Sequence, residues 1–293
     1  MRVAHLAGRK VTPALEEAVA VLDPGAPNDY REIAALLANE WVAGPPTFVG
    51  LSGGQGAGKS TLSRLIAAAC EGVGMRACVL SLDDFYFPLS VRRELAVDIH
   101  ALLETRGPPG THDIMRCQEV MSGLRNDDSK NGIELPVFDK GLDDRRASRR
   151  ETGPFDIVLL EGWCVGAAPE TESDLAASIN SLEENEDPDG RWRRHVNAQL
   201  ADQYAETWRM LDYLIYLRVP DLEAVRRWRL DQERERPLHQ RMQPAAIDRF
   251  VQHFERTTLA MDRSLPGFAD LVVELAADHS VSSVRIGSQR ETT

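Results

Sequence analysis

A run of nine residues in this chain fits the P-loop pattern G-x-x-x-x-G-K-[ST], which binds nucleotide phosphates. Its glycines let successive backbone N–H groups turn toward an anion, while Lys59 would reach the β- and γ-phosphates and the Ser60 hydroxyl would ligate Mg²⁺. An apolar stretch at 47–51 precedes the run, and apolar residues at helical spacing follow it, as a strand, loop and helix require. The predicted phosphate-binding residues are Gly53, Gly54, Gln55, Gly56, Ala57, Gly58, Lys59, Ser60 and Thr61.

Carboxylates end two other apolar stretches. Glu161 follows four aliphatic residues, a pattern that brings a carboxylate to Mg²⁺, and we predict that it shares the metal with Ser60. Asp83 and Asp84 close the other stretch, and if the strand continues through them only one side chain can face the phosphates. We predict that this one is Asp83, which would accept the proton of an attacking hydroxyl or join the metal shell. The alternative is that both acids cap the following turn.

The elements that must position these residues alternate between strand and helix. Apolar strand candidates at 76–82, 155–160, 213–219 and 271–275 are separated by helical segments. This alternation predicts an α/β fold with a mainly parallel sheet and helices on both faces. Ligands bind at the carboxyl ends of the strands in such sheets, where the P-loop and both carboxylates would meet.

The chain divides into two predicted parts. Residues 1–45 form a helical preface, with helices expected in two pieces over 12–43, and residues 46–293 form the main domain. Within that domain, 168–190 hold eight acidic residues and no basic one, which indicates a solvated insertion loop.

Bulk composition favours a small-molecule partner. The net charge of −12 disfavours nucleic acid, whose binding depends on the phosphate backbone. No stretch has the apolar core of a signal peptide or the length of a membrane span, so we expect no membrane partner. The four cysteines form no C-x-x-C pair, which points away from zinc or a disulfide framework and toward the cytoplasm.

Several blocks together resemble D-glycerate 3-kinase of the plant and bacterial type. They are the P-loop, the Leu-Asp-Asp-Phe-Tyr strand end at 82–86, and the segments 106–113, 136–145 and 159–163, in a similar order along the chain. The resemblance implies a P-loop NTPase fold, ATP and Mg²⁺ as cofactors, and transfer of the γ-phosphoryl to an alcohol of D-glycerate to give 3-phosphoglycerate. The wider group includes uridine kinases, pantothenate kinases and phosphoribulokinases, in which the first Asp of Asp-x-Phe is the base. Asp83 stands at that position here.

The acceptor-binding residues are also assigned from this resemblance. Glycerate carries a carboxylate, which arginine binds bidentately, so we expect Arg106 or Arg145 to hold it. His112 and Asp113 would orient the hydroxyls. For Lys140 and Asp144, which lie in the same blocks, a turn stabilised by surface ion pairs is an equal alternative. The expected set is Arg106, His112, Asp113, Lys140, Asp144 and Arg145.

The segment of about 226–256 resembles the family's lid region. Its mixed charges are typical of a solvated helix with i,i+4 pairs, but a break at 236–237 and nearby arginines predict a lid that supplies positive charge to the transferring phosphoryl. The candidates are Arg234, Arg236 and Arg241. The alternatives to a glycerate kinase are a related kinase acting on a nucleoside, pantothenate or a sugar phosphate, and a non-catalytic nucleotide-binding regulatory protein.

Overall fold

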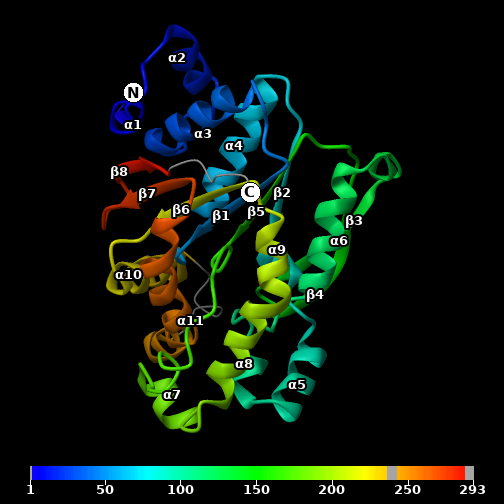
Figure 1. Ribbon diagram of the computed structural model, residues 1–293, viewed down its shortest axis with the longest axis vertical. Helices are drawn as coiled ribbons and strands as arrows, with labels where there is room; N and C mark the ends of the chain where they lie inside the picture. The colour runs from blue at the N-terminus through cyan, green and yellow to red at the C-terminus, as the bar shows by residue number, and fades with distance from the viewer. Residues whose placement is uncertain (1, 236–242, 288–293) are drawn as a thin grey trace.

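A six-stranded sheet forms the centre of the computed structural model, which describes residues 2–235 and 243–287 (Figure 1). The order across the sheet is β2, β5, β1, β6, β7, β8, and only β8 runs antiparallel to its neighbour. The strands are β1 (Phe48–Gly53), β2 (Ala77–Ser81), β5 (Ile157–Gly162), β6 (Tyr213–Arg218), β7 (Leu271–Leu275) and β8 (Val281–Ile286). The predicted α/β fold and its five parallel strands are therefore confirmed.

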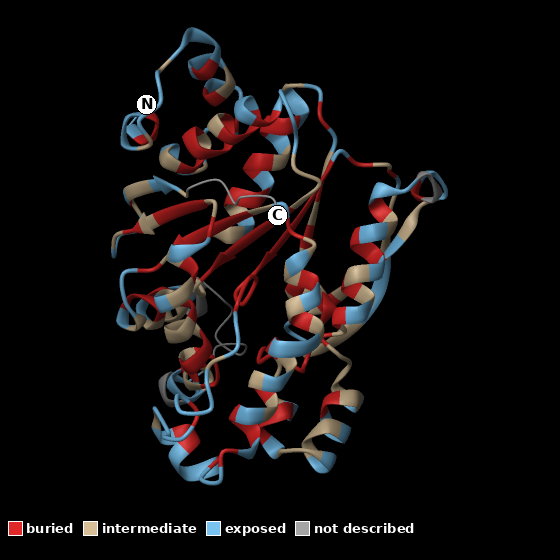
Figure 2. Cartoon of the chain, viewed as in Figure 1, coloured by how far each residue is buried: buried red, intermediate tan, exposed pale blue. Residues whose placement is uncertain are grey.

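Helices cover both faces of this sheet. Alternate residues of β5 show the division, because Ile157 and Leu159 belong to one apolar core whereas Val158 and Leu160 belong to another. The first core takes in α1 (Arg2–Leu6), α2 (Pro13–Ala20), α3 (Asn28–Trp41), α4 (Lys59–Gly72) and α10 (Leu222–Glu235). The second takes in α6 (Ile114–Arg125) and α11 (Pro244–Ser264). The strands between these cores are buried along most of their length (Figure 2).

A smaller antiparallel hairpin lies beside the sheet. It joins β3 (Ile133–Asp139) and β4 (Asp144–Glu151). The remaining helices are α5 (Leu89–Asp98), α7 (Ser181–Glu186), α8 (Arg191–Gln199) and α9 (Ala205–Arg209). The hairpin matters for the site because its turn carries Lys140 toward the end of β2.

The acidic segment 168–190 differs from the predicted solvated loop. It contains α7, and two of its acids, Glu183 and Asp187, are fully buried. Glu183 pairs with Arg256 and Asp187 pairs with Arg193. The prediction was wrong for these two carboxylates, because arginines distant from them in the sequence or on α8 supply the charges that permit burial.

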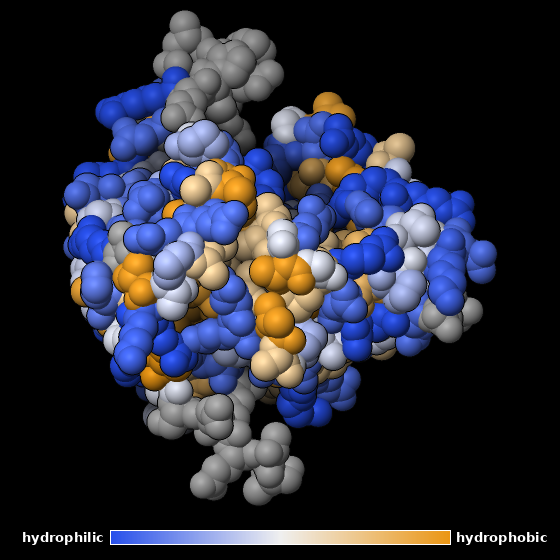
Figure 3. Space-filling model, turned by 90° about the horizontal axis from the view of Figure 1, so that it is seen from above, coloured by the Kyte–Doolittle hydropathy of each residue, from blue (hydrophilic) through white to orange (hydrophobic). Residues whose placement is uncertain are grey.

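The surface carries few apolar groups on the face seen in Figure 3. That face is mainly hydrophilic, with apolar side chains in small scattered groups. Among the helices that the structure describes, none is both long and apolar enough to cross a membrane.

Candidate active site

The P-loop joins β1 to α4 through two glycines in the left-handed region. Gly56 has φ 81° and Gly58 has φ 79°. A Cβ atom at Gly56 would come within 2.7 Å of the Trp228 side chain, and one at Gly58 within 2.8 Å of the Tyr30 ring. Only glycine fits at these two positions. The loop is thereby held against α3 and α10, with the N-terminus of α4 directed at the place where phosphates would sit.

Lys59 begins α4 and folds back over this loop. Its Nζ donates hydrogen bonds to the carbonyl oxygens of Gly53, at 2.9 Å, and Gly54, at 3.0 Å. Burial lowers the pKa of the Lys59 ammonium, while the nearby carboxylates of Glu161 and Asp83 act in the opposite direction. The ammonium therefore faces two acids across a common cavity.

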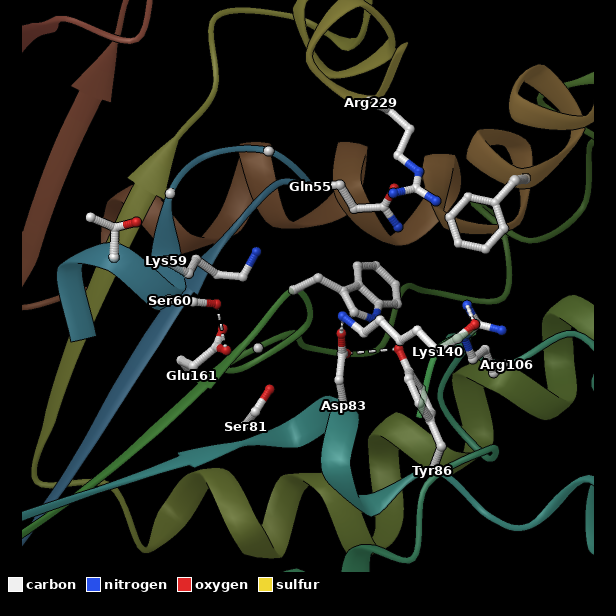
Figure 4. Close-up of a pocket in the computed structure, with 16 residues that line it drawn as sticks. Gln55, Lys59, Ser60, Ser81, Asp83, Tyr86, Arg106, Lys140, Glu161 and Arg229 are labelled. Carbon is white, nitrogen blue, oxygen red and sulfur yellow. Dashed lines mark hydrogen bonds and ion pairs between the residues drawn. The ribbon is translucent and has the colours of Figure 1, made fainter. Parts of the chain in front are cut away.

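That cavity has a volume of about 470 Å³ and opens at the carboxyl ends of β1, β2 and β5. Figure 4 shows the P-loop residues on one side and the Asp83 group on the other, with Arg229 and Gln55 above them. The lining residues are Gln55, Gly56, Gly58, Lys59, Ser60, Thr61, Ser81, Asp83, Tyr86, Arg106, Lys140, Glu161, Gly162, Trp163, Arg229 and Phe250. One continuous space thus connects the P-loop with part of the predicted acceptor site.

Ser60 and Glu161 lie together at the P-loop side. The Ser60 Oγ donates a hydrogen bond of 3.0 Å to Glu161 Oε1, and Glu161 is buried at the end of β5. A hydroxyl and a carboxylate are hard oxygen ligands of the kind that Mg²⁺ takes together with phosphate oxygens and water. Within the described residues, no group of three or more His, Cys, Asp or Glu side chains could hold a metal by itself. The two oxygens therefore fit a metal that is shared with a bound nucleotide.

Asp83 lies at the opposite side of the cavity. The strand ends at Ser81, and a 3-10 turn at Leu82–Phe85 follows it. In this turn Asp83 enters the cavity, whereas Asp84 turns away and accepts a hydrogen bond of 3.1 Å from the Phe138 N–H. The two acids are separated by the turn rather than by the alternation of a continuing strand.

Both oxygens of the Asp83 carboxylate have partners. Oδ1 accepts a hydrogen bond of 2.8 Å from the Tyr86 hydroxyl, and Oδ2 lies 2.6 Å from the Lys140 Nζ (Figure 4). Burial alone would raise the pKa of this carboxyl, but the Lys140 charge and these hydrogen bonds together hold it well below its usual range. Asp83 is therefore ionised, and the Lys140 ammonium is its counter-ion.

Two of the six predicted acceptor-binding residues line the cavity. They are Arg106 and Lys140, which come from different segments and lie at the same end of the space. Arg106 pairs with Asp143 on the hairpin turn and also donates to the Lys140 carbonyl oxygen at 3.4 Å. The guanidinium of Arg106 thus ties down the turn that carries Lys140.

The other four predicted acceptor residues lie outside the cavity lining. His112 is buried beneath Tyr86, with ring centroids 4.6 Å apart, and its Nδ1 lies 2.6 Å from the Tyr204 hydroxyl. Burial lowers the pKa of His112 to about 4, so the ring is neutral. The ring supports the Tyr86 ring from behind, and its contact with the acceptor stays a prediction.

Asp113, Asp144 and Arg145 form a bracket around the same turn. Asp113 caps α6 through the Arg116 N–H and pairs with Arg145 at 3.2 Å. Arg145 also donates to the Tyr86 carbonyl oxygen at 2.8 Å, and Asp144 accepts from the N–H groups of Leu89 and Arg145. In this structure their polar groups bind the chain itself, and acceptor binding by these three residues stays a prediction.

The lid candidates have mixed outcomes. Arg234 lies at the exposed end of α10, where it pairs with Asp231 at 2.7 Å. Arg236 and Arg241 lie outside the described residues. Arg229, earlier on α10, lines the cavity instead, and Phe250 of α11 joins it. Sequence reasoning missed Arg229 because it looked for the lid at the 236–237 break rather than one or two helical turns before it.

Four further lining residues were also missed. They lie at or just after the ends of β2 and β5, and they are Ser81, Tyr86, Gly162 and Trp163. The signal was present for Tyr86, which stands three residues after Asp83 and therefore returns to the same side of a 3-10 turn.

Comparison with known proteins gives relatives that are kinases. An uncharacterized kinase of Schizosaccharomyces pombe, mug58, is 31% identical over 224 residues, which are 72% of this chain and 79% of that protein. The chloroplastic D-glycerate 3-kinase of Arabidopsis thaliana is 28% identical over 201 residues, which cover 64% of this chain and 41% of that protein.

The fold has counterparts among solved structures. A D-glycerate 3-kinase from Cryptococcus neoformans var. grubii matches with a TM-score of 0.69 at 22% identity, over 94% of this chain and 100% of that chain. At this identity the likeness concerns the fold alone. No protein-family model matches the chain.

Proposed function

Because the chain belongs to the D-glycerate 3-kinase-like group of P-loop kinases, and so is a phosphotransferase with an alcohol acceptor, we propose that its reaction converts ATP and D-glycerate into ADP and 3-phosphoglycerate. The observation that carries this proposal is the single cavity lined both by the P-loop and by Asp83. A phosphoryl donor on one side and a base on the other are what an in-line transfer to an alcohol needs.

Each residue has a proposed part in the transfer. The acceptor hydroxyl oxygen forms a bond to the γ-phosphorus and passes its proton to Asp83. The bond between the γ-phosphorus and the β,γ-bridging oxygen breaks, and ADP leaves with that electron pair. Lys59 leaves the carbonyls of Gly53 and Gly54 for the phosphates, and Arg229 adds positive charge from above.

We propose that Ser60 and Glu161 hold Mg²⁺, which neutralises charge on the phosphates when it is bound. We favour the base for Asp83, because it lies across the cavity from Ser60 and Glu161, and its place in the metal shell stays the alternative prediction.

Charge at the acceptor end of the cavity favours a small acid. Arg106 and Lys140 offer a guanidinium and an ammonium there, which suits the carboxylate of glycerate. An uncharged nucleoside offers these two cations no opposite charge, so a uridine kinase activity is disfavoured. Pantothenate and sugar phosphates are anionic and belong in the test. A small-molecule partner without nucleic acid or membrane, and a cytoplasmic location, stay predictions from the sequence.

The test is ADP release from Mg-ATP with D-glycerate, L-glycerate, uridine, pantothenate and ribulose 5-phosphate in turn. We expect turnover with D-glycerate, and Asp83→Asn should lower it about 10²- to 10⁴-fold, the range for loss of a general base, while ATP affinity is kept.

Asp84→Asn is the matched control, because this neighbouring acid lies outside the cavity lining and its amide oxygen can still accept from Phe138. Turnover with another acceptor alone would contradict glycerate as the substrate. An equal loss in both variants would contradict the role of Asp83.

A further inference from the structure

We infer that Lys140 decides which acceptors are phosphorylated. Its ammonium stays paired with the base Asp83 until the anionic group of an acceptor draws the ammonium away. This inference rests on the proposed function, in which Asp83 takes the proton of the acceptor hydroxyl. It adds a condition to that function: the charge on the acceptor releases the base.

Each oxygen of Asp83 already accepts one hydrogen bond, and the two donors draw charge from the carboxylate. The Tyr86 hydroxyl donates to Oδ1 at 2.8 Å and the Lys140 ammonium donates to Oδ2 at 2.6 Å. A carboxylate that accepts two such bonds, one of them from a cation, is a weak base. Departure of one of these donors, above all the cation, would make the carboxylate a stronger base.

Tyr86 is the fixed donor of the two. Its ring is buried, stacks on His112 with centroids 4.6 Å apart, and meets the Phe138 ring edge-on at 5.2 Å. His112 is in turn held by the Tyr204 hydroxyl. Moving the Tyr86 hydroxyl off Asp83 would break this aromatic stack, so Tyr86 stays where it is.

Lys140 is the donor that can leave. Its side chain is half exposed and comes from the turn between β3 and β4. Among the described residues its ammonium has one carboxylate partner, Asp83, and the side chain is a flexible four-carbon stem. The backbone of the turn stays in place, because Arg106 binds both Asp143 and the Lys140 carbonyl oxygen. The ammonium can thus swing while its Cα is held.

The remaining charged and titratable groups around Asp83 do not replace Lys140. Lys59 faces Asp83 from the P-loop side, but its ammonium binds the P-loop carbonyls and, in the proposed reaction, the nucleotide phosphates. His112 is kept neutral by burial, Cys164 is buried, and Asp84 turns away to Phe138. Lys140 is therefore the cation whose departure changes the state of the base.

An anionic acceptor can replace Asp83 as the partner of the Lys140 ammonium. Its carboxylate enters the end of the cavity where Arg106 and Lys140 lie, and it competes with Asp83 for the Lys140 ammonium. The freed Asp83 oxygen then accepts the hydroxyl proton as the oxygen attacks the γ-phosphorus and ADP leaves. Water and uncharged alcohols lack the anion, so they leave the base occupied and ATP is not hydrolysed wastefully.

The experiment compares the wild type with Lys140→Met, Lys140→Gln and Lys140→Arg. Acceptor-independent ATP hydrolysis is measured first, and then kcat/KM for D-glycerate and for glycerol, which lacks the carboxylate. Arg146→Met is the matched control, because it removes one positive charge from an exposed position on the same hairpin without touching the cavity.

We expect Lys140→Met and Lys140→Gln to hydrolyse ATP without acceptor about 10-fold faster than the wild type. An adjacent cation lowers the pKa of a carboxyl by about 1 or more, so removing the cation makes Asp83 a stronger base. Their KM for D-glycerate should rise about 10-fold or more through loss of a charge-assisted hydrogen bond. The preference for D-glycerate over glycerol falls accordingly. Lys140→Arg should keep hydrolysis slow and most of the preference, and Arg146→Met should behave as the wild type.

Two results would overturn the inference. One is acceptor-independent hydrolysis in both Lys140→Met and Lys140→Gln that is no faster than in the wild type, with ATP affinity unchanged. The other is faster hydrolysis that persists when Asp83→Asn is added to Lys140→Met, because the gain would then not pass through the base. If the wild type fails to phosphorylate D-glycerate, the proposed function fails, while the hydrolysis measurements still decide the role of Lys140.

Discussion

Two ion pairs in this chain have the same chemistry and opposite surroundings. At the cavity, Lys140 and Asp83 have side chains that are 50% and 27% exposed. Beneath the acidic segment, Arg256 and Glu183 are 9% and 0% exposed. The first pair consists of one short contact from a flexible chain, whereas the second is a fork in which Nε meets Oε1 and Nη2 meets Oε2, each at 2.7 Å.

Burial decides what each pair can do. Arg256 also donates to the carbonyl oxygens of Asp174 and Ala177, and Glu183 accepts from the Ile179 N–H. Because both side chains are buried, water cannot replace a lost partner. This pair fastens the acidic segment to α11. The same helix brings Phe250 to the cavity. The buried pair is scaffold for the site, and the exposed pair is free to exchange partners.

Removing the buried cation should have the largest effect on stability. We expect Arg256→Met to lower the free energy of unfolding by about 3–5 kcal/mol, because it leaves the Glu183 carboxylate buried without its counter-ion. Urea denaturation measures this. The matched control is Arg263→Met on the same helix, whose 61% exposed side chain pairs with Glu170 and should contribute no more than about 1 kcal/mol. Equal losses in the two variants would contradict the distinction by burial.

A histidine beside the buried pair should make this region sensitive to acid. Burial lowers the pKa of His253 on α11 from 6.5 to about 4. Between these values the unfolded chain binds a proton that the folded chain does not, so stability falls as the pH decreases from about 6.5 to 4. Replacing His253 with Phe should remove up to about 1.4 kcal/mol per pH unit of that slope.

The measurement is the free energy of unfolding of both proteins at several pH values between 7 and 4.5. His112, also lowered to about 4, remains in both proteins and contributes equally to each slope. Identical slopes for the wild type and His253→Phe would show that His253 is protonated in the folded state as readily as in the unfolded one.

Local patterns in the sequence predicted much of the fold. Four of the five parallel strands are apolar runs buried along most of their length, and such runs are visible without knowledge of their neighbours. The edge strand β2 is buried at alternate residues. The strand β4 was missed, because its sequence, Asp-Arg-Arg-Ala-Ser-Arg-Arg-Glu, has no apolar alternation and its side chains are largely exposed. A strand that buries little leaves no periodic signal.

The site was predictable where its geometry is local. The P-loop and the acid at the end of β5 are contiguous motifs, and both reach the cavity. The acceptor end was harder, because residue type did not show that His112 and Arg145 would lie against Tyr86 rather than in the cavity lining. The same limit applies to Glu183, whose partner Arg256 is 73 residues away. Residue type and local spacing do not show which buried charges will meet.

Removing the exposed cation should have the smallest effect on stability. Lys140→Met should change the free energy of unfolding by no more than about 1 kcal/mol, because Lys140 is half exposed and water can solvate Asp83 in its place. Urea denaturation beside Arg256→Met gives the comparison directly. A loss as large as that of Arg256→Met would mean that the Lys140 contact is part of the scaffold, and a scaffold contact cannot leave its partner in every catalytic cycle. A small loss of unfolding free energy together with faster ATP hydrolysis would give the two carboxylates separate roles. Glu183 holds α11 in position, and Asp83 becomes a stronger base when its cation is drawn away.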